Sequence, residues 1–221
     1  MSRALPERHA AALRVFFPTG RFEAGRLTLV LLVGALAVSI LTHFGANQTQ
    51  VDYFSITRYR LLDGHFGWKS GLPEICHGEI WRLFTPIFIH FGITHLLVNS
   101  IWIFIFGTLI EKRQSVWVLV LLVLGVAGLS NLAQYVVRGP AFGGMSGVMC
   151  GLLGYLWTRD LLDPAAGLRL DRLVLVWAIL YAFASSVGVF GNAGQIAHAA
   201  GFLVGLVAGI VSGLRAKSLS Q

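Results

Sequence analysis

The chain is 221 residues long, with 56% hydrophobic and 12% charged residues and a mean hydropathy of +0.73. This apolar share is too high, and the charged share too low, for the water-facing surface of a soluble domain. The formal net charge of +7 would favour nucleic acid only if the basic residues formed one face, and here they separate apolar stretches. Composition therefore predicts a helical membrane protein with one domain and no nucleic-acid partner.

Apolar stretches recur along the chain at close to the ~20 residues that a helix needs to cross a bilayer. Six spans are predicted, of which the fourth is the shortest: Leu27–Phe44, Phe91–Ile110, Val116–Val137, Ser146–Thr158, Leu173–Gly188 and Gln195–Leu214. They form a helical domain over residues 27–214. We expect residues 1–26 to be a cytoplasmic segment that is not cleaved as a signal peptide, and residues 215–221 to be a cytoplasmic tail.

The connection between the first two spans is longer than ordinary loops, and it contains Trp68, Pro73, Trp81 and Pro86. We expect it to be partly folded and interfacial, with its tryptophans at headgroup level. Lys and Arg are more numerous in the two termini and the alternate loops than in this long loop. The positive-inside rule therefore predicts cytoplasmic termini and an outer long loop. Short termini without an organelle signal favour a bacterial inner membrane.

Polar side chains at membrane depth are costly and are candidates for function. They are few here: His95, Asn99, Ser130, Asn131, Gln134, Ser146 and His198. At a rise of ~1.5 Å per helical residue, one layer about 18–25 Å from the cytoplasmic charges contains His95, Asn99, Ser146 and His198. That layer lies below the outer surface of a ~30 Å core, where a water-filled cavity would be needed.

Ser146 is the candidate nucleophile, and His95 and His198 are the titratable groups at its depth that could take its proton. A membrane serine more often bonds its own helix, which is the reading that we favour for Ser130. Ser146 differs because the glycine-rich run 142–147 places it at a helix start. Unpaired backbone N–H groups there suit an oxyanion.

His95 and Asn99 share one face of the second span, either as oxyanion donors or as a hydrogen-bonding pair between helices. The alternative for His198 is a packing histidine. We favour a catalytic role for His198 because helix faces made of glycine follow both His198 and Ser146. Packing of these two faces against each other would bring the His198 and Ser146 side chains into reach. These faces comprise Gly201 and Gly205 on the sixth span, and Gly147, Gly151 and Gly154 on the fourth. Replacement of Gly209, two helical turns further toward the cytoplasm, by valine is expected to impair activity far less than replacement of Gly201 by valine.

Every acidic residue falls in a loop or at a span end, so a Ser-His dyad is expected without the carboxylate of the soluble triad. The same pattern excludes paired intramembrane aspartates, and the absence of His-Glu-x-x-His excludes that zinc protease motif. Cys76 and Cys150 are expected to be unpaired.

The motifs together resemble the rhomboid family of intramembrane serine proteases from Glu79 to about Gly209. Those that carry the resemblance are Glu79-Ile80-Trp81-Arg82, His90 with His95 and Asn99, Glu111-Lys112-Arg113, Gly144-Met145-Ser146-Gly147, and His198 with Gly201 and Gly205. The resemblance implies an all-α fold of six transmembrane helices with a long outer loop between the first and second. It also implies Ser146 as nucleophile, His198 as general base and then acid, and His95, Asn99 and the Ser146 amide as oxyanion donors. His90 and Arg82 are implied to be structural.

One departure concerns Cys150, which stands where members of that family often have a tyrosine packed on the catalytic histidine. The expected function is cleavage of transmembrane or membrane-anchored proteins near the outer membrane face, without cofactor or metal. The main alternative is a catalytically inactive rhomboid relative that binds transmembrane helices. A transporter is disfavoured because paired repeats and broken helices are not seen in both halves.

Overall fold

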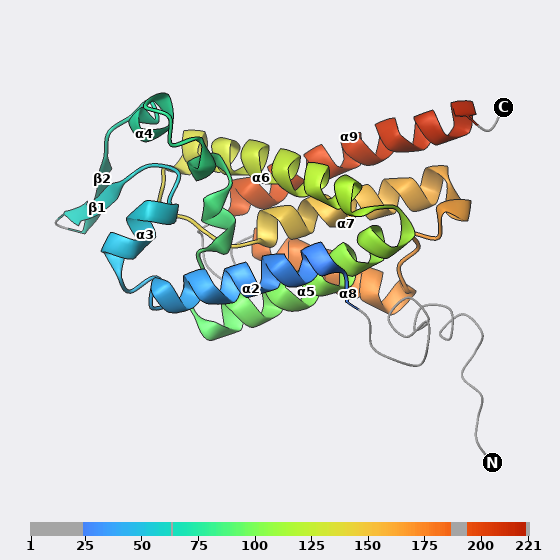
Figure 1. The fold of residues 1–221 in the computed structure, drawn as a ribbon, viewed down its shortest axis with the longest axis horizontal. Coiled ribbons are helices and arrows are strands. Elements are labelled where there is room, and N and C mark those ends of the chain that lie inside the picture. The colour runs from blue at the N-terminus through green and yellow to red at the C-terminus, as the bar shows by residue number, and fades with distance from the viewer. Residues whose placement is uncertain (1–23, 63, 187–193, 220–221) are drawn as a thin grey trace, which may run out of the picture.

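The computed structural model describes residues 24–62, 64–186 and 194–219, and within these ranges the chain is mostly helical (Figure 1). A helix overlaps each predicted span: α2 (Arg26–Leu41), α5 (Ile93–Arg113), α6 (Val116–Arg138), α7 (Ser146–Leu162), α8 (Arg172–Ser186) and α9 (Gln195–Leu219). By length and composition, α5, α6 and α9 could cross a membrane, whereas α2 and α8 are apolar but shorter.

The helix ends differ from the predicted ones at several places. The first helix stops at Leu41, because the backbone turns through positive φ at His43 and Phe44, and the Phe44 N–H bonds back to the Ser39 carbonyl at 2.7 Å. The second begins only after Gly92, whose φ of 152° is outside the helical region. The predicted end of the fifth at Gly188, residues 1–23 of the N-terminal segment and residues 220–221 of the tail lie outside the described residues.

The prediction that the fourth span is the shortest was wrong. Hydropathy placed its end before Arg159, but α7 continues to Leu162 and is 17 residues long, against 16 for α2. The Arg159 side chain is buried at the end of the helix and donates to the Asp163 carboxylate at 3.1 Å, so its charge does not mark the end of the helix. A short 3-10 turn, η3 (Pro164–Ala166), then leads towards α8.

The segment between α2 and α5 is not purely helical. It contains α3 (Gln48–Phe54), β1 (Tyr59–Leu62), β2 (His65–Trp68), α4 (Pro73–Cys76), η1 (Ile80–Leu83) and η2 (Thr85–Phe88). The two strands pair antiparallel, with Tyr59 opposite Trp68, so the all-α expectation needs correction. These short aromatic-containing runs flank the sequence Asp63-Gly64, which favours a tight hairpin turn. Figure 1 places the hairpin, α3 and α4 at the end of the bundle opposite the C-terminal end of α9.

Buried ionic contacts hold this segment together. Arg82 is 1% exposed; its Nε donates to Glu79 at 2.6 Å, and its Nη1 donates to the backbone carbonyls of Ser55 and Asp52. Burial alone would raise the pKa of the Glu74 carboxyl, but hydrogen bonds from the Thr57 hydroxyl at 2.5 Å and from the backbone hold that pKa below its ordinary value. The segment is therefore folded against itself.

Helix α7 is the centre of the bundle, buried continuously from Ser146 to Leu156, and its most extensive contact is with α9. The predicted packing of glycine faces is confirmed. A Cβ atom on Gly201 would overlap the Gly147 carbonyl oxygen, and one on Gly205 would overlap that of Gly151. A Cβ on Gly209 would overlap the Thr158 hydroxyl, so this glycine is also closely packed, and the smaller effect on activity expected for Gly209→Val stays a prediction.

Candidate active site

Ser146 is the first residue of α7 and follows a tight glycine turn. Gly144 has a φ of 112°, a conformation that a side chain disfavours, and its N–H donates to the Pro86 carbonyl at 3.0 Å. The first hydrogen bond within the helix runs from the Met149 N–H to the Met145 carbonyl. Backbone N–H groups before Met149 therefore have no acceptor within α7, and they give this end a partial positive charge beside the Ser146 hydroxyl.

His198 lies in the first turn of α9, and its Nε2 is 2.6 Å from the Ser146 Oγ. Both side chains are buried, with 7% and 8% exposure respectively. If Nε2 accepts the serine proton, the ring proton sits on Nδ1. The Nδ1 atom is buried beside the Ser185 backbone of α8, and it makes no hydrogen bond of good geometry to any of the described residues. This geometry lacks the carboxylate that orients the histidine of a Ser-His-Asp triad.

His95 and Asn99 lie one turn apart on α5, beside the turn at Gly144. The Phe91 N–H donates to His95 Nδ1 at 3.4 Å, so the His95 proton is on Nε2. A Cβ built on Gly144 would be 2.7 Å from His95 Nε2 and 3.6 Å from Asn99 Nδ2, which places both donors beside the backbone that precedes Ser146.

Asn99 is fully buried, and its Nδ2 also donates to the His95 carbonyl at 3.0 Å. The hydrogen bonds that the structure gives these two side chains therefore lie within α5 and the turn before it. They do not match the alternative of a pair that joins two helices.

A cavity of about 610 Å³ opens at this site, between the start of α5 and the end of α8. Its lining includes Phe91, His95, Val98, Ser146, Tyr181 and His198. The nucleophile candidate, its histidine and one candidate oxyanion donor thus face one space. A bond to be cut could enter there beside Ser146.

Two cavity residues were missed from the sequence. Tyr181 and Ser185, one turn apart on α8, line the cavity with His198. A polar pair at this spacing inside an apolar span was an available signal. Cys150 is buried one turn after Ser146 and is not among the residues that line the cavity, whereas Tyr181 of α8 is.

The remaining polar candidates make structural contacts. The Ser130 hydroxyl donates to the Ala127 carbonyl of its own helix at 3.4 Å, as expected. Asn131 Nδ2 donates to the Leu83 carbonyl at 2.8 Å and so ties α6 to η1. His90 Nδ1 is 3.1 Å from the Phe88 carbonyl, and its ring contacts His95 edge-on with centroids 5.0 Å apart.

The chain matches the model of the rhomboid domain over residues 77–215. It is 33% identical to the rhomboid protease GlpG of Salmonella paratyphi A over 203 residues, which are 91% of this chain and 68% of the relative. The rhomboid proteases GlpG of Salmonella choleraesuis and Salmonella typhi are each 32% identical over the same shares. The matched range contains every residue of the site described above, and the chain belongs to the rhomboid family of intramembrane serine proteases.

Proposed function

We propose that this protease cleaves transmembrane or membrane-anchored proteins near the outer membrane face, with Ser146 as nucleophile and His198 as general base. The observation that carries the proposal is the 2.6 Å contact between His198 Nε2 and Ser146 Oγ inside a cavity of the bundle. A serine hydroxyl attacks a carbonyl poorly until a neighbouring base takes its proton, and this contact is short enough for direct transfer.

The reaction then follows from the two side chains. Ser146 Oγ attacks the substrate carbonyl carbon while its proton passes to His198 Nε2. The imidazolium returns the proton to the leaving amine, and the peptide bond breaks to give an acyl-serine. A water molecule deprotonated by the same histidine attacks the ester, and Ser146 leaves with its proton restored. Each half of the cycle uses the same two atoms, so loss of either side chain stops both.

The negative charge on the tetrahedral intermediate is stabilised by three donors in this proposal: His95 Nε2–H, Asn99 Nδ2–H and the Ser146 amide. Support comes from the position of both side chains beside Gly144 and from the unpaired amides at the start of α7. A buried site strengthens such hydrogen bonds because little water competes for them.

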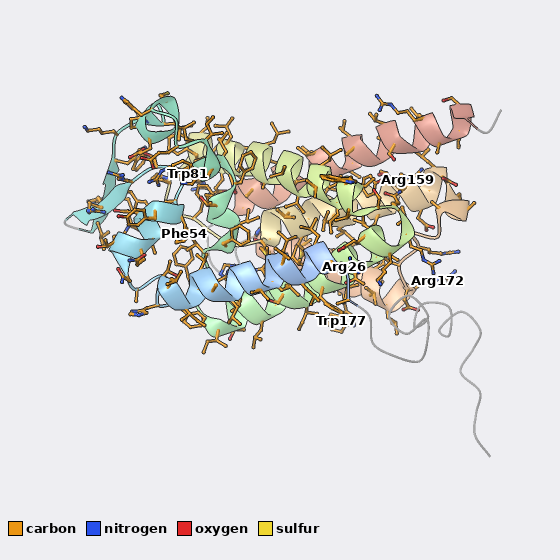
Figure 2. The ribbon with its side chains drawn as sticks, in the orientation of Figure 1. Arg26, Phe54, Trp81, Arg159, Arg172 and Trp177 are labelled. Carbon is orange, nitrogen blue, oxygen red and sulfur yellow. The ribbon has the colours of Figure 1, made fainter. Side chains whose placement is uncertain are left out.

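The membrane placement belongs to the same proposal. All six helices cross the bilayer, α2, α7 and α8 included, with both termini in the cytoplasm and the segment between α2 and α5 outside. Arg159 and Arg172 lie towards the C-terminal end of α9, whereas Trp81 lies at the opposite end (Figure 2). Arg159 and Arg172 at one end fit a cytoplasmic interface, and exposed tryptophans at both ends, Trp81 at one and Trp177 at the other, fit the two membrane interfaces. A bacterial inner membrane is the compartment that we propose.

The test is cleavage of a purified transmembrane substrate in proteoliposomes by the wild type, Ser146→Ala and His198→Ala. Both variants should lose turnover while keeping the thermal unfolding profile. Ser130→Ala is the matched control, since it removes another buried membrane serine and should retain activity. Substantial turnover by Ser146→Ala or His198→Ala would rule out the dyad. Binding of transmembrane helices without any cleavage by the wild type would favour the inactive alternative.

A further inference from the structure

The start of α9 is fixed by a side chain from another helix. Gln134 of α6 is 2% exposed, and its Oε1 accepts a hydrogen bond from the Ala197 N–H at 3.0 Å. Ala197 lies in the first turn of α9, where backbone N–H groups have no acceptor within the helix. The first such bond inside α9 runs from the His198 N–H to the Gly194 carbonyl. Gln134 therefore supplies the capping acceptor that this helix end would otherwise lack.

The capped residue adjoins both members of the dyad. Ala197 precedes His198 in the chain, and it also packs on α7: a Cβ built on Gly147 would lie 3.3 Å from the Ala197 carbonyl and 3.4 Å from its Cβ. Gly147 follows Ser146. The Ala197 backbone is thus held between Gln134 on one side and the residue next to the nucleophile on the other, and a shift of this turn would move His198 relative to Ser146.

We propose that Gln134 is a positioning residue for the protease reaction: its amide oxygen sets the first turn of α9 so that His198 Nε2 meets Ser146 Oγ. This inference rests on the proposed Ser146–His198 function. Gln134 touches neither the substrate nor the reacting atoms in this arrangement, and it acts through the Ala197 amide. Its substitution should therefore lower the rate of the chemical step more than it weakens substrate binding.

Two substitutions separate the hydrogen bond from the volume of the side chain. Gln134→Met keeps a similar length but removes the strong acceptor, whereas Gln134→Glu keeps a carboxyl oxygen able to accept. A displacement of ~1 Å at a reacting group can cost ~100-fold in rate. We expect Gln134→Met to lower kcat by about 10- to 100-fold with little change in KM. Gln134→Glu should recover most of that loss.

Leu119→Ala is the control for a general loss of stability, because Leu119 is fully buried in the same helix about 22 Å away along its axis. It should lower the unfolding temperature without lowering kcat of the folded protein.

The experiment measures the rate of Ser146 labelling by a fluorophosphonate, together with kcat and KM, on full-length protein in detergent at a temperature where every variant is folded. Slow labelling of Gln134→Met, rescue by Gln134→Glu and normal labelling of Leu119→Ala are the expected results. Wild-type labelling rates in Gln134→Met, or equally slow labelling in Gln134→Glu, would overturn the positioning role alone. Failure of the wild type to label at Ser146 would overturn the proposed dyad, and the positioning role with it.

Discussion

Gly201→Ala adds one methyl group at the contact between α7 and α9. A Cβ at this position would overlap the Gly147 carbonyl oxygen and lie 3.0 Å from its carbonyl carbon. Because these are backbone atoms, no rotamer change can relieve the clash, and the two helices must separate by on the order of 1 Å to restore ordinary contact distances. Overpacking of this kind typically costs about 1–3 kcal/mol of stability. A ~1 Å displacement between Ser146 and His198 corresponds to a loss of ~100-fold in turnover.

The measurement pairs substrate turnover in proteoliposomes with the unfolding temperature of the same preparation. Gly125→Ala is the matched control: Gly125 is exposed on α6, and a Cβ there would meet nothing within 4 Å. Replacing an exposed helical glycine by alanine stabilises by about 0.5–1 kcal/mol, so this variant should be fully active and no less stable. If Gly201→Ala turned over substrate as fast as Gly125→Ala, close contact of α7 and α9 would not be what holds the dyad together.

Two further substitutions test the donor site and the outer segment. Asn99→Ala should lower turnover by ~100-fold, which is the scale for the loss of one oxyanion donor, while substrate binding changes little. An unchanged kcat in the same cleavage assay would show that Asn99 is not an oxyanion donor. Glu74→Gln should destabilise the protein at pH 7, because the folded-state pKa of Glu74 lies below its ordinary value of 4.5 and the charged form is favoured on folding. That contribution is present above pH 4.5 and is lost as the pH falls through the folded-state pKa, so thermal unfolding of the variant and the wild type should converge in acid; a constant gap from pH 7 to pH 3 would refute this.

A helix overlaps each of the six spans predicted from hydropathy, because a long apolar stretch can be recognised in the sequence without knowledge of its neighbours. Helix ends depend on local detail that hydropathy does not record. Positive φ at His43 and Phe44 ends the first helix, and α7 continues past the buried Arg159, where a charge had predicted its end. The strand pair could be predicted in principle from Asp63-Gly64 between two short runs with aromatic residues, but strands of 4 residues are too short to appear in hydropathy averaged over a membrane span.

The candidate site was predictable because few polar residues lie at membrane depth, and their distance along each helix sets the layer that they share. Rotation of each helix about its own axis is not fixed by that count. The role of Gln134 was missed for this reason. Its Oε1 accepts from the Ala197 N–H, 63 residues away in the chain, and this contact depends on how α6 packs against α9. Tyr181 and Ser185 likewise reach the cavity through the placement of α8 against α9.

Identification of the covalently modified residue tests the Ser146–His198 dyad most directly. Purified wild-type protein would be treated with a fluorophosphonate, and the adduct would be mapped by peptide mass spectrometry beside His198→Ala. We predict a single adduct on Ser146 in the wild type and its loss in His198→Ala, because the serine needs the histidine to remove its proton. An adduct on another serine, or undiminished labelling of Ser146 in His198→Ala, would contradict the dyad.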